Sequence, residues 1–322
     1  MIAVLDDTSG TTRRRRLAVP AGDGRTRAVF VKTPSASMLP RVVVALGGLG
    51  RAEVGFYRDA APAVPLVVPR CLGADALFGS FRLVLDDLVT AGAAAFRLGD
   101  ELPIAVVEEA LATLARLHGT FWEDRRLVSG EWSWCRSFVP AGEATLGWLL
   151  APALSAVGRH RASAALPDVV ARGLARYARR RTLALRRLDH GPRTLLHHDC
   201  HPGNMAQLAD DCIMLFDWQL VRAGPWASDV AYLLATSLAP DDRRTHERRL
   251  LAHYLDALVA AGGRPPAAAE AWQAYVAHLV YPLEAMVVTL AFGAMQPAAA
   301  VRRVVDRAAV AVADHDAFAV VS

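Results

Sequence analysis

Three oxygen-bearing side chains with the chemistry of a catalytic site lie close together in the second half of the chain. Asp199 and Asn204 put a carboxylate and an amide at the two ends of one loop, and Asp217 ends the next apolar stretch, Ile213–Phe216. Hard oxygen ligands of this kind suit Mg²⁺, which keeps several waters and takes one or two carboxylates. Phosphoryl transfer needs such a metal site and a base for the attacking hydroxyl. We therefore predict Asn204 and Asp217 as Mg²⁺ ligands and Asp199 as the catalytic base.

Phosphoryl transfer also needs a cationic side chain that contacts the phosphates of the donor, and the chain has one clear candidate for it. The chain has 36 Lys and Arg residues, and Lys32 is the only lysine among them. Lysine carries a compact point charge on a flexible stem, whereas arginine carries a wide planar fork. A lone lysine among arginines indicates a site that accepts only the compact cation, and chance retention on the surface is the alternative interpretation.

Hydrophobic spacing divides the chain into a β-rich part and a helical part. We expect an α+β architecture with a small β-rich N-lobe at residues 1–88, which includes one helix at Leu49–Ala60, and a large helical C-lobe at residues 89–322. The predicted strands are Met1–Asp6, Arg14–Pro20, Arg27–Thr33, Arg70–Ala74, Phe81–Leu85, Leu195–Leu196 and Ile213–Phe216. The predicted C-lobe helices are Val106–Trp122, Pro167–Leu188, Ser228–Ser237, Asp242–Ala261, Ala267–Phe292 and Ala298–Ala313.

Charge and composition restrict the class of partner. The net charge is +4, but the arginines are scattered, and the dense run is Arg13–Arg16. We interpret that run as an exposed strand edge or a patch beside bound phosphates, and we expect no nucleic-acid partner. Met1–Val19 has no apolar core of a signal peptide, and Met286–Met295 is too short to span a bilayer, so we expect a cytoplasmic protein with no membrane partner. The four cysteines lack C-x-x-C spacing, which favours reduced thiols.

Three motifs between residues 195 and 231 give the chain a family resemblance. Leu195–Asn204, Phe216–Gln219 and Gly224–Ala231 resemble the H-x-D-x4-N, D-[FW] and D-[LV]-A motifs of the aminoglycoside phosphotransferase and choline-kinase-like superfamily, including its ecdysteroid-kinase-like branch. The resemblance implies a bilobal protein-kinase-like fold, ATP or alternatively GTP as phosphoryl donor, and Mg²⁺ as metal. It also implies that Asp229 anchors the loop, and that His197 is a catalytic-site residue whose ring packs behind the metal-binding carboxylate.

The N-lobe resembles the same family less closely, with its parts in the same order. Lys32 falls on the third predicted strand, where the family places a catalytic lysine that contacts the α- and β-phosphates, and Glu53 resembles the helix glutamate that pairs with it. The resemblance further implies a nucleotide-covering loop and a hinge whose backbone binds adenine. The loop residues are Ser9, Gly10 and Thr11, and the hinge residues are Leu85, Asp86 and Asp87, followed by Leu88.

The chain departs from the family pattern beside the predicted base and in the phosphate loop. His198 stands next to Asp199 where the family usually has glycine, and the phosphate loop has a single glycine, Gly10. An imidazole at this place would crowd the acceptor or contact it. His198 is therefore also a candidate acceptor-site residue.

The predicted partner is a small molecule with a hydroxyl group. The acids of the C-lobe are sparse and matched by arginines, which is unfavourable for a polycationic aminoglycoside. The Arg- and Ala-rich composition is similar to that of high-GC bacteria such as antibiotic-producing actinomycetes, so an antibiotic or other natural product is the favoured acceptor, in resistance or self-resistance. The candidate acceptor-site residues are His198, His201, Gln219, Trp272, Tyr275 and Glu284.

Other interpretations stay open for the activity. The acceptor could be a primary metabolite such as choline, a sugar or an amino alcohol. The chain could also be a catalytically silent binding protein with a kinase-like fold. Either form would act as a monomer or a homodimer.

Two rival kinds of site are less compatible with the spacing. The cluster His197–His201 lacks the second ligand pair of a closed zinc site. Gly48 and Gly50 resemble the start of a dinucleotide-binding turn, but Glu53 stands where the third glycine belongs, and its charge is wrong for a pyrophosphate. A glycine-rich entry to a helix is the preferred interpretation.

Overall fold

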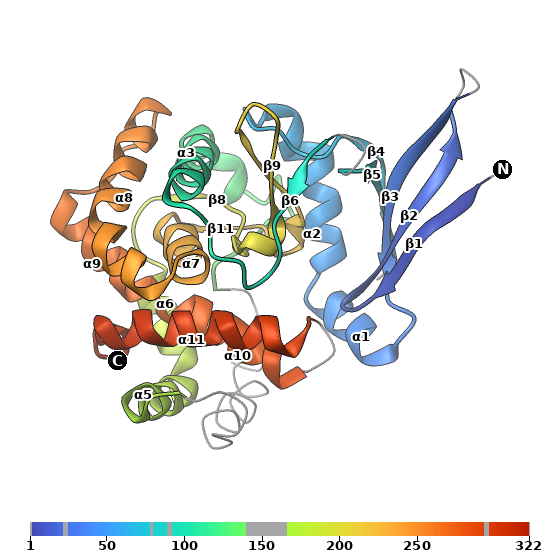
Figure 1. The fold of residues 1–322 in the computed structure, drawn as a ribbon. Coiled ribbons are helices and arrows are strands. Elements are labelled where there is room, and N and C mark those ends of the chain that lie inside the picture. Colours follow the sequence, from blue (N-terminus) through green and yellow to red (C-terminus); the bar gives the residue numbers. More distant parts are fainter. Residues whose placement is uncertain are drawn as a thin grey trace.

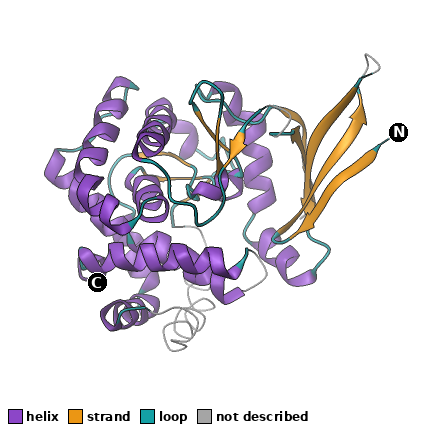
Figure 2. Cartoon of the chain, viewed as in Figure 1, coloured by secondary structure: helices purple, strands orange, loops and turns teal. Residues whose placement is uncertain are grey.

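The computed structural model of the chain describes residues 2–21, 25–77, 80–88, 92–139, 166–292 and 296–321. An antiparallel sheet that carries the N-terminus stands at one end of the molecule, and helices make up most of the rest (Figure 1, Figure 2). The fold is α+β and bilobal, with a small β-rich N-lobe and a large helical C-lobe, which confirms the predicted fold class.

The N-lobe sheet consists of antiparallel strands, which are β1 (Ala3–Ser9), β2 (Thr12–Pro20), β3 (Thr26–Pro34), β4 (Cys71–Leu77) and β5 (Ser80–Asp86). Their order across the sheet is β1-β2-β3-β5-β4. Arg14 of β2 lies opposite Lys32 of β3, and Lys32 lies opposite Leu83 of β5. Because cross-strand partners point to the same side of a sheet, these side chains share one face. β1 and β2 are longer than predicted, and only a short turn joins them.

Helical segments that pack on this sheet follow β3, and they are α1 (Met38–Leu46), α2 (Leu49–Gly55), a π-helical turn (Phe56–Ala60) and a 3-10 turn (Ala61–Ala63). Gly48 precedes α2 with a φ of 62°, a backbone conformation that favours glycine. Gly50 brings α2 close to β5, because a Cβ at this position would lie 2.2 Å from the ring of Phe81. Gly48 thus allows the helix to begin, and Gly50 allows it to pack closely on the sheet. This agrees with the preferred interpretation of a glycine-rich entry to a helix.

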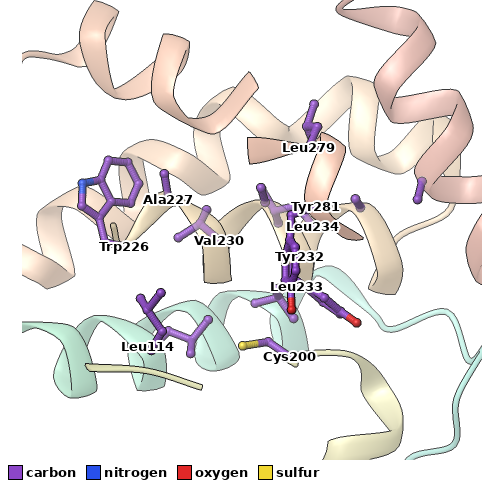
Figure 3. Close-up of a cluster of buried hydrophobic side chains, with 14 of the residues drawn as sticks. Leu114, Cys200, Trp226, Ala227, Val230, Tyr232, Leu233, Leu234, Leu279 and Tyr281 are labelled. Atoms are coloured by element: carbon purple, nitrogen blue, oxygen red, sulfur yellow. The ribbon is translucent and has the colours of Figure 1, made fainter. Parts of the chain in front are cut away.

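The C-lobe helices are α3 (Ile104–Thr120), α5 (Asp168–Arg179), α6 (Arg181–Leu188), α7 (Ala227–Ser237), α8 (Pro240–Ala260), α9 (Ala268–His278), α10 (Val280–Phe292), α11 (Ala298–Asp314) and α12 (Ala317–Val321). Every residue of α7 is buried, as expected for a helix that is packed on all sides. Figure 3 shows residues of α7 between Leu114 of α3 and Leu279, with Cys200 of the predicted catalytic loop close by. The central helix therefore supplies a rigid support for that loop.

Short strands and turns frame the predicted catalytic residues, and they are β6 (Ala94–Ala95), β7 (Arg136–Ser137), β8 (Arg193–Leu196), β9 (Met205–Gln207), β10 (Ile213–Leu215), β11 (Arg222–Pro225) and 3-10 turns at Arg125–Leu127, Pro202–Asn204 and Trp218–Leu220. One small sheet has the order β10-β9-β6 and the other β7-β11-β8. Asp199 follows β8, and Asp217 follows β10. Each of the two acids therefore comes at the end of a strand that pairs with a neighbour.

Two predicted helices are each divided in two. The segment Pro167–Leu188 breaks at Arg180, and the segment Ala267–Phe292 breaks at Leu279. Pro282 accounts for the second break, because proline lacks the N–H that would bond to the carbonyl of His278 and its ring clashes with that carbonyl. Within the described residues, the stretch Ala268–Ala291 is long and apolar enough to cross a membrane, but 61% of it is buried in the protein, as in a core helix.

Candidate active site

The loop that carries Asp199 is held by one buried carboxylate, that of Asp229 at the start of α7. The Asp229 Oδ2 atom accepts the backbone N–H of His197, and Oδ1 accepts that of His198, each at 2.8 Å. His118 of α3 contributes its Nε2 atom, 3.2 Å from Oδ2. Asp229 therefore joins the loop to α3 and α7, which is the anchoring role that the resemblance implied.

The Asp199 carboxylate is held in place through both of its oxygens. The Tyr232 hydroxyl donates to Oδ1 at 2.8 Å, and the Asn204 amide donates to Oδ2 at 2.9 Å. The same Asn204 nitrogen also donates to the Asp199 backbone carbonyl at 3.0 Å. The Asp199 side chain is still 13% exposed. The predicted base is therefore oriented by its own protein and keeps an accessible edge.

Lys32 joins two carboxylates that come from different lobes. Its Nζ atom lies 2.7 Å from Oε2 of Glu53 on α2 and 2.6 Å from Oδ1 of Asp217 after β10. Only 2% of Lys32 is exposed, so the one lysine of the chain is a buried cation where the two lobes meet. The structure thus brings together the residues predicted for the nucleotide and for the metal.

The three charges of this group have unequal pKa shifts. Burial alone would lower the pKa of Lys32, but the two carboxylates outweigh it and raise that pKa. Burial raises the pKa of Glu53 to about 7, in spite of the attraction of Lys32. The pKa of Asp217 is lowered, because Lys32 outweighs the effect of burial there. Asp217 therefore keeps its negative charge more firmly than Glu53 does.

The His197 ring orients the segment that leads to Asp217. Its Nδ1 atom accepts the backbone N–H of Asp199 at 3.3 Å, so Nε2 carries the proton and donates to the Phe216 carbonyl at 3.0 Å. Burial lowers the pKa of His197, which keeps the ring neutral. Trp218 lies 4.6 Å from the His197 ring and stacks on Phe56 at 3.8 Å. These rings connect the catalytic loop to the helix segment that carries Glu53.

Asn204 and Asp217 have the free atoms that a Mg²⁺ site needs. The Asn204 nitrogen is taken by Asp199, which leaves its amide oxygen as a ligand, and Lys32 takes only one of the two Asp217 oxygens. Asp217 has a φ of 64°, an uncommon conformation for a residue other than glycine, which is often found at functional sites. No group of three or more His, Cys, Asp or Glu side chains is arranged for a metal in the described part of the chain. A metal here would therefore complete its shell with water and phosphate oxygens.

The predicted nucleotide-covering residues lie at the turn between β1 and β2. Ser9 ends β1, and Gly10 and Thr11 form the turn. The Ser9 hydroxyl lies 3.2 Å from that of Ser35, which follows β3. The turn is therefore tied to the strand that carries Lys32.

The predicted hinge lies at the end of β5, and its acids are paired. Leu85 is buried opposite Phe30 of β3. Asp86 forms an ion pair with Arg27. Asp87 is buried and pairs with Arg16 of β2 at 2.7 Å. The hinge carboxylates are thus engaged with the sheet, and only their backbone stays a candidate for adenine.

The predicted acceptor-site residues nearest the base differ in exposure. His198 does not crowd the acceptor, because it is 1% exposed and its ring stacks on Tyr281 at 4.0 Å. Its φ of 65° turns the side chain into the core, which corrects the expectation that it contacts the substrate. His201 does lie beside the base, with Nε2 3.6 Å from Asp199 Oδ1. Gln219 follows Asp217 closely, and its buried Oε1 atom has no partner in the described residues.

The remaining acceptor-site candidates lie within the packing of the C-lobe. Tyr275 is fully buried and donates its hydroxyl to Glu247 at 2.8 Å. Trp272 packs under Arg248, whose guanidinium carbon lies 4.0 Å from the ring centre. Glu284 is 3% exposed and pairs with Arg181 at 2.6 Å. These side chains already have protein partners, so the structure gives no support to their assignment as acceptor-site residues, which stays a prediction.

Sequence reasoning missed Tyr232, the residue that fixes the base. It lies three positions after Asp229, and residues so spaced share one face of a helix. Both side chains therefore reach the same loop, Asp229 through the backbone and Tyr232 through the Asp199 carboxylate. The spacing after the D-V-A motif could have indicated this second contact.

A separate hollow of about 610 Å³ lies on another side of α2. Its walls include Val44 of α1, Val54 of α2, Phe81 of β5 and Trp134. None of the predicted catalytic, metal or nucleotide residues lines it. It is therefore distinct from the site around Lys32 and Asp217.

Comparison with known proteins shows to which family the chain belongs. The model of the phosphotransferase enzyme family matches residues 17–279, which is most of the chain. The chain belongs to this family. The matched range includes Lys32, Glu53, Asp199, Asn204 and Asp217. No curated protein gives a significant match to the full sequence.

Solved structures with the same fold share little sequence with this phosphotransferase-family chain. Choline kinase from Cryptosporidium parvum has a TM-score of 0.59 at 9% identity, with 99% of this chain and 88% of that chain covered. Ethanolamine kinase from Plasmodium vivax has a TM-score of 0.56 at 11% identity, with 98% and 81% covered. A mutant aminoglycoside 2′-phosphotransferase IIIa in complex with GDP has a TM-score of 0.54 at 11% identity, with 98% and 91% covered. The likeness shows the kinase-like fold.

Proposed function

We propose that the protein is a kinase that transfers the γ-phosphoryl group of ATP to a hydroxyl of a small molecule. The observation that carries this proposal is the contact of the two lobes at Asp217. Lys32 of the N-lobe lies 2.6 Å from this carboxylate, and the oriented Asp199 lies on the adjoining loop of the C-lobe. A phosphoryl donor and an acceptor hydroxyl need a cation, a metal site and a base in this arrangement.

Each residue has a distinct part in the proposed reaction. Asp199 accepts the hydrogen bond of the acceptor hydroxyl and takes its proton as the new O–P bond forms, while the bond from the γ-phosphorus to the β–γ bridging oxygen breaks and ADP leaves. Lys32 donates to the phosphate oxygens of the nucleotide. Asn204 and Asp217 would hold Mg²⁺, which neutralises charge on the phosphates when bound. Tyr232 keeps the base in position, so the protein pays little reorganisation in the transition state.

We further propose that the acceptor is a weakly charged natural product, such as an antibiotic, and not a polycation. A polycation would need several free carboxylates around the site. Several C-lobe carboxylates are paired instead, with Glu284 on Arg181 and Glu247 and Asp314 on Arg243. A primary metabolite such as an amino alcohol is the alternative acceptor, since choline and ethanolamine kinases share the fold.

A mass-spectrometric screen tests both levels of the proposal. The purified protein would be incubated with Mg²⁺ and ATP or GTP, and with panels of hydroxylated antibiotics, amino alcohols and sugars. One transferred phosphoryl group adds roughly 80 daltons to the acceptor. Turnover of antibiotics supports the natural-product acceptor, and turnover of amino alcohols or sugars alone would reject it. Failure to bind either nucleotide in the presence of Mg²⁺ would reject the kinase and favour a silent binding protein.

A further inference from the structure

The sheet face that carries Lys32 holds a second cation from the run Arg13–Arg16. Arg14 is the cross-strand partner of Lys32, so the two side chains leave the sheet side by side on the same face. This face packs on α2, because Lys32 reaches Glu53 of that helix. Figure 1 shows β2 and β3 adjacent in the sheet, with α2 between the sheet and the C-lobe. Arg14 therefore leaves the sheet on the same side as the lone lysine, where the N-lobe meets the C-lobe.

The four arginines of the run have different surroundings. Arg13 forms an ion pair with Asp7 at 2.5 Å, on the exposed side of the hairpin. Arg16 forms an ion pair with Asp87 of the hinge at 2.7 Å. Arg14 has no ion pair in the described residues, and its buried Nε atom has no hydrogen-bond partner there. A buried guanidinium N–H without a partner is costly and calls for an explanation, such as a ligand.

Arg15 serves as a comparison for Arg14, because the two residues share an unpaired Nε but differ in the sheet face from which the side chain leaves. Its Nε atom is also buried without a partner in the described residues. Successive side chains of a strand point to opposite faces, however, and Arg15 lies opposite Asp7 of β1 and Val31 of β3. Of the two unpaired arginines, only Arg14 therefore shares a face with Lys32.

The negative charge of the two carboxylates around Lys32 favours a second cation nearby, such as Arg14. Lys32 is a single cation between two carboxylates, those of Glu53 and Asp217. The phosphates of a nucleotide would add further negative charge here, so a cation beside Lys32 is favourable in addition to the proposed Mg²⁺. Arg14 lies close enough to the Asp217 carboxylate for the two opposite charges to attract each other. Its planar fork of donors also fits two phosphate oxygens at once.

We propose that Arg14 is a second phosphate-binding residue of the nucleotide site, beside Lys32. The proposal rests on the proposed kinase function, because it assigns a nucleotide to this cleft. It predicts that the N-lobe recognises the phosphate chain by two side chains of different shape, a point charge and a fork. Arg14 acts on nucleotide affinity, and Asp199 acts on the chemical step.

Calorimetric titration of matched variants tests the role of Arg14. Wild type, Arg14→Gln, Arg14→Lys and the control Arg15→Gln would be titrated with Mg-ATP, Mg-ADP and adenosine, or with the guanosine series if wild type prefers it. A lost charge-assisted hydrogen bond weakens Mg-ATP and Mg-ADP binding about tenfold or more in Arg14→Gln. Adenosine binding stays unchanged, Arg14→Lys recovers part of the loss, and Arg15→Gln resembles wild type.

The outcomes distinguish this inference from the kinase proposal. If wild type binds Mg-ATP and Arg14→Gln binds it equally well, the role of Arg14 is rejected while the kinase stands. An equal loss for adenosine and Mg-ATP would also reject it, because the effect would then not involve phosphates. If wild type binds no nucleotide, both proposals fail together. Thermal unfolding midpoints close to that of wild type would show that the variants are folded.

Discussion

The two sides of the cleft are built in different ways. On the C-lobe side, Asp199 is fixed by Tyr232 and Asn204, and its loop is fixed by the buried Asp229. On the N-lobe side, Lys32 is held by ion pairs, one of which crosses to Asp217 in the other lobe. The first side is set by hydrogen bonds in a packed core, and the second by charges that a ligand can compete for. The comparison suggests that the base is ready before substrate binds, whereas the nucleotide side rearranges on binding.

The largest expected effect comes from removing the base. Asp199→Asn should lower kcat by about two to four orders of magnitude, the range of general-base catalysis. The amide keeps the size of the carboxylate, so the affinity for Mg-ATP should stay close to that of wild type. Single-turnover kinetics and nucleotide titration measure the two quantities. Asp256→Asn, at an exposed position of α8, serves as control.

If Asp199→Asn lowered the nucleotide affinity as well as kcat, the base side and the nucleotide side would not be independent. It would mean that the base also shapes the nucleotide side of the cleft. An unchanged kcat would remove Asp199 from the chemistry altogether.

The packed core of the C-lobe should also make the stability of the protein depend on pH. Burial lowers the pKa of His278 from 6.5 to about 4, although the backbone contacts of its ring favour the protonated form. The folded state therefore binds this proton less tightly than the unfolded chain does, and stability falls as pH is lowered from 6.5 toward 4. The contribution of this one residue is about 3 kcal/mol.

Urea unfolding of wild type and His278→Gln between pH 7 and pH 4.5 measures that contribution. The glutamine of the variant cannot take up a proton on unfolding, so the variant should lose less stability than wild type as pH falls. Parallel losses in the two proteins would show that His278 is not the group responsible. Burial lowers the pKa of His197 and His198 as well, and both proteins retain those residues.

A smaller effect is expected from the residue that orients the base. Tyr232→Phe removes the donor to Asp199 Oδ1 and should lower kcat by about tenfold, the value of one hydrogen bond to a charged group. The KM for ATP should not change, because Tyr232 contacts the base side alone. Tyr254→Phe is the matched control, since its hydroxyl contacts His118 and not Asp199. Equal losses of kcat in both variants would indicate a general packing effect.

The smallest effect is expected at the edge of the N-lobe side. Arg16→Gln breaks the pair between the partly exposed Arg16 and the buried Asp87, and because Asp87 keeps another interaction the free energy of unfolding should fall by only about 1 kcal/mol. We expect no change in kcat, because the pair contacts the hinge and not the reacting groups. Denaturant unfolding and steady-state kinetics check both statements, with the exposed pair of Arg82 and Asp75 as reference. A large fall in kcat would show that the hinge side is as rigid as the base side.

The sequence predicted the base side better than the acceptor side for a physical reason. The residues on the base side belong to one loop and the end of the next strand, and they are Asp199, Asn204 and Asp217. Because these segments are close in sequence, the sequence spacing of the three residues already indicates that they are close in space. Lys32 was found from its rarity in composition and its place on a strand. The outline of the two lobes followed from the change of hydrophobic period along the chain.

Three of the predicted acceptor-site residues, Trp272, Tyr275 and Glu284, find no support in the structure, because a helical period does not indicate what a helix face packs against. Trp272 and Tyr275 lie near each other on one helix, but Arg248 and Glu247 of α8 and His315, which follows α11, pack against them. Short strands such as β9 and β11 were missed because three or four residues are too few to show a period. The direction of His198 depends on a positive φ that no side-chain pattern indicates.

The solitary lysine has a practical consequence for experiments on this protein. Because Lys32 is the only lysine and is buried between Glu53 and Asp217, isotopic labelling of lysine places a single spectroscopic reporter in the cleft. Its side-chain signal in nuclear magnetic resonance needs no assignment by mutation. The chemical shift of that one amino group would follow nucleotide and metal binding directly, without a substrate in hand.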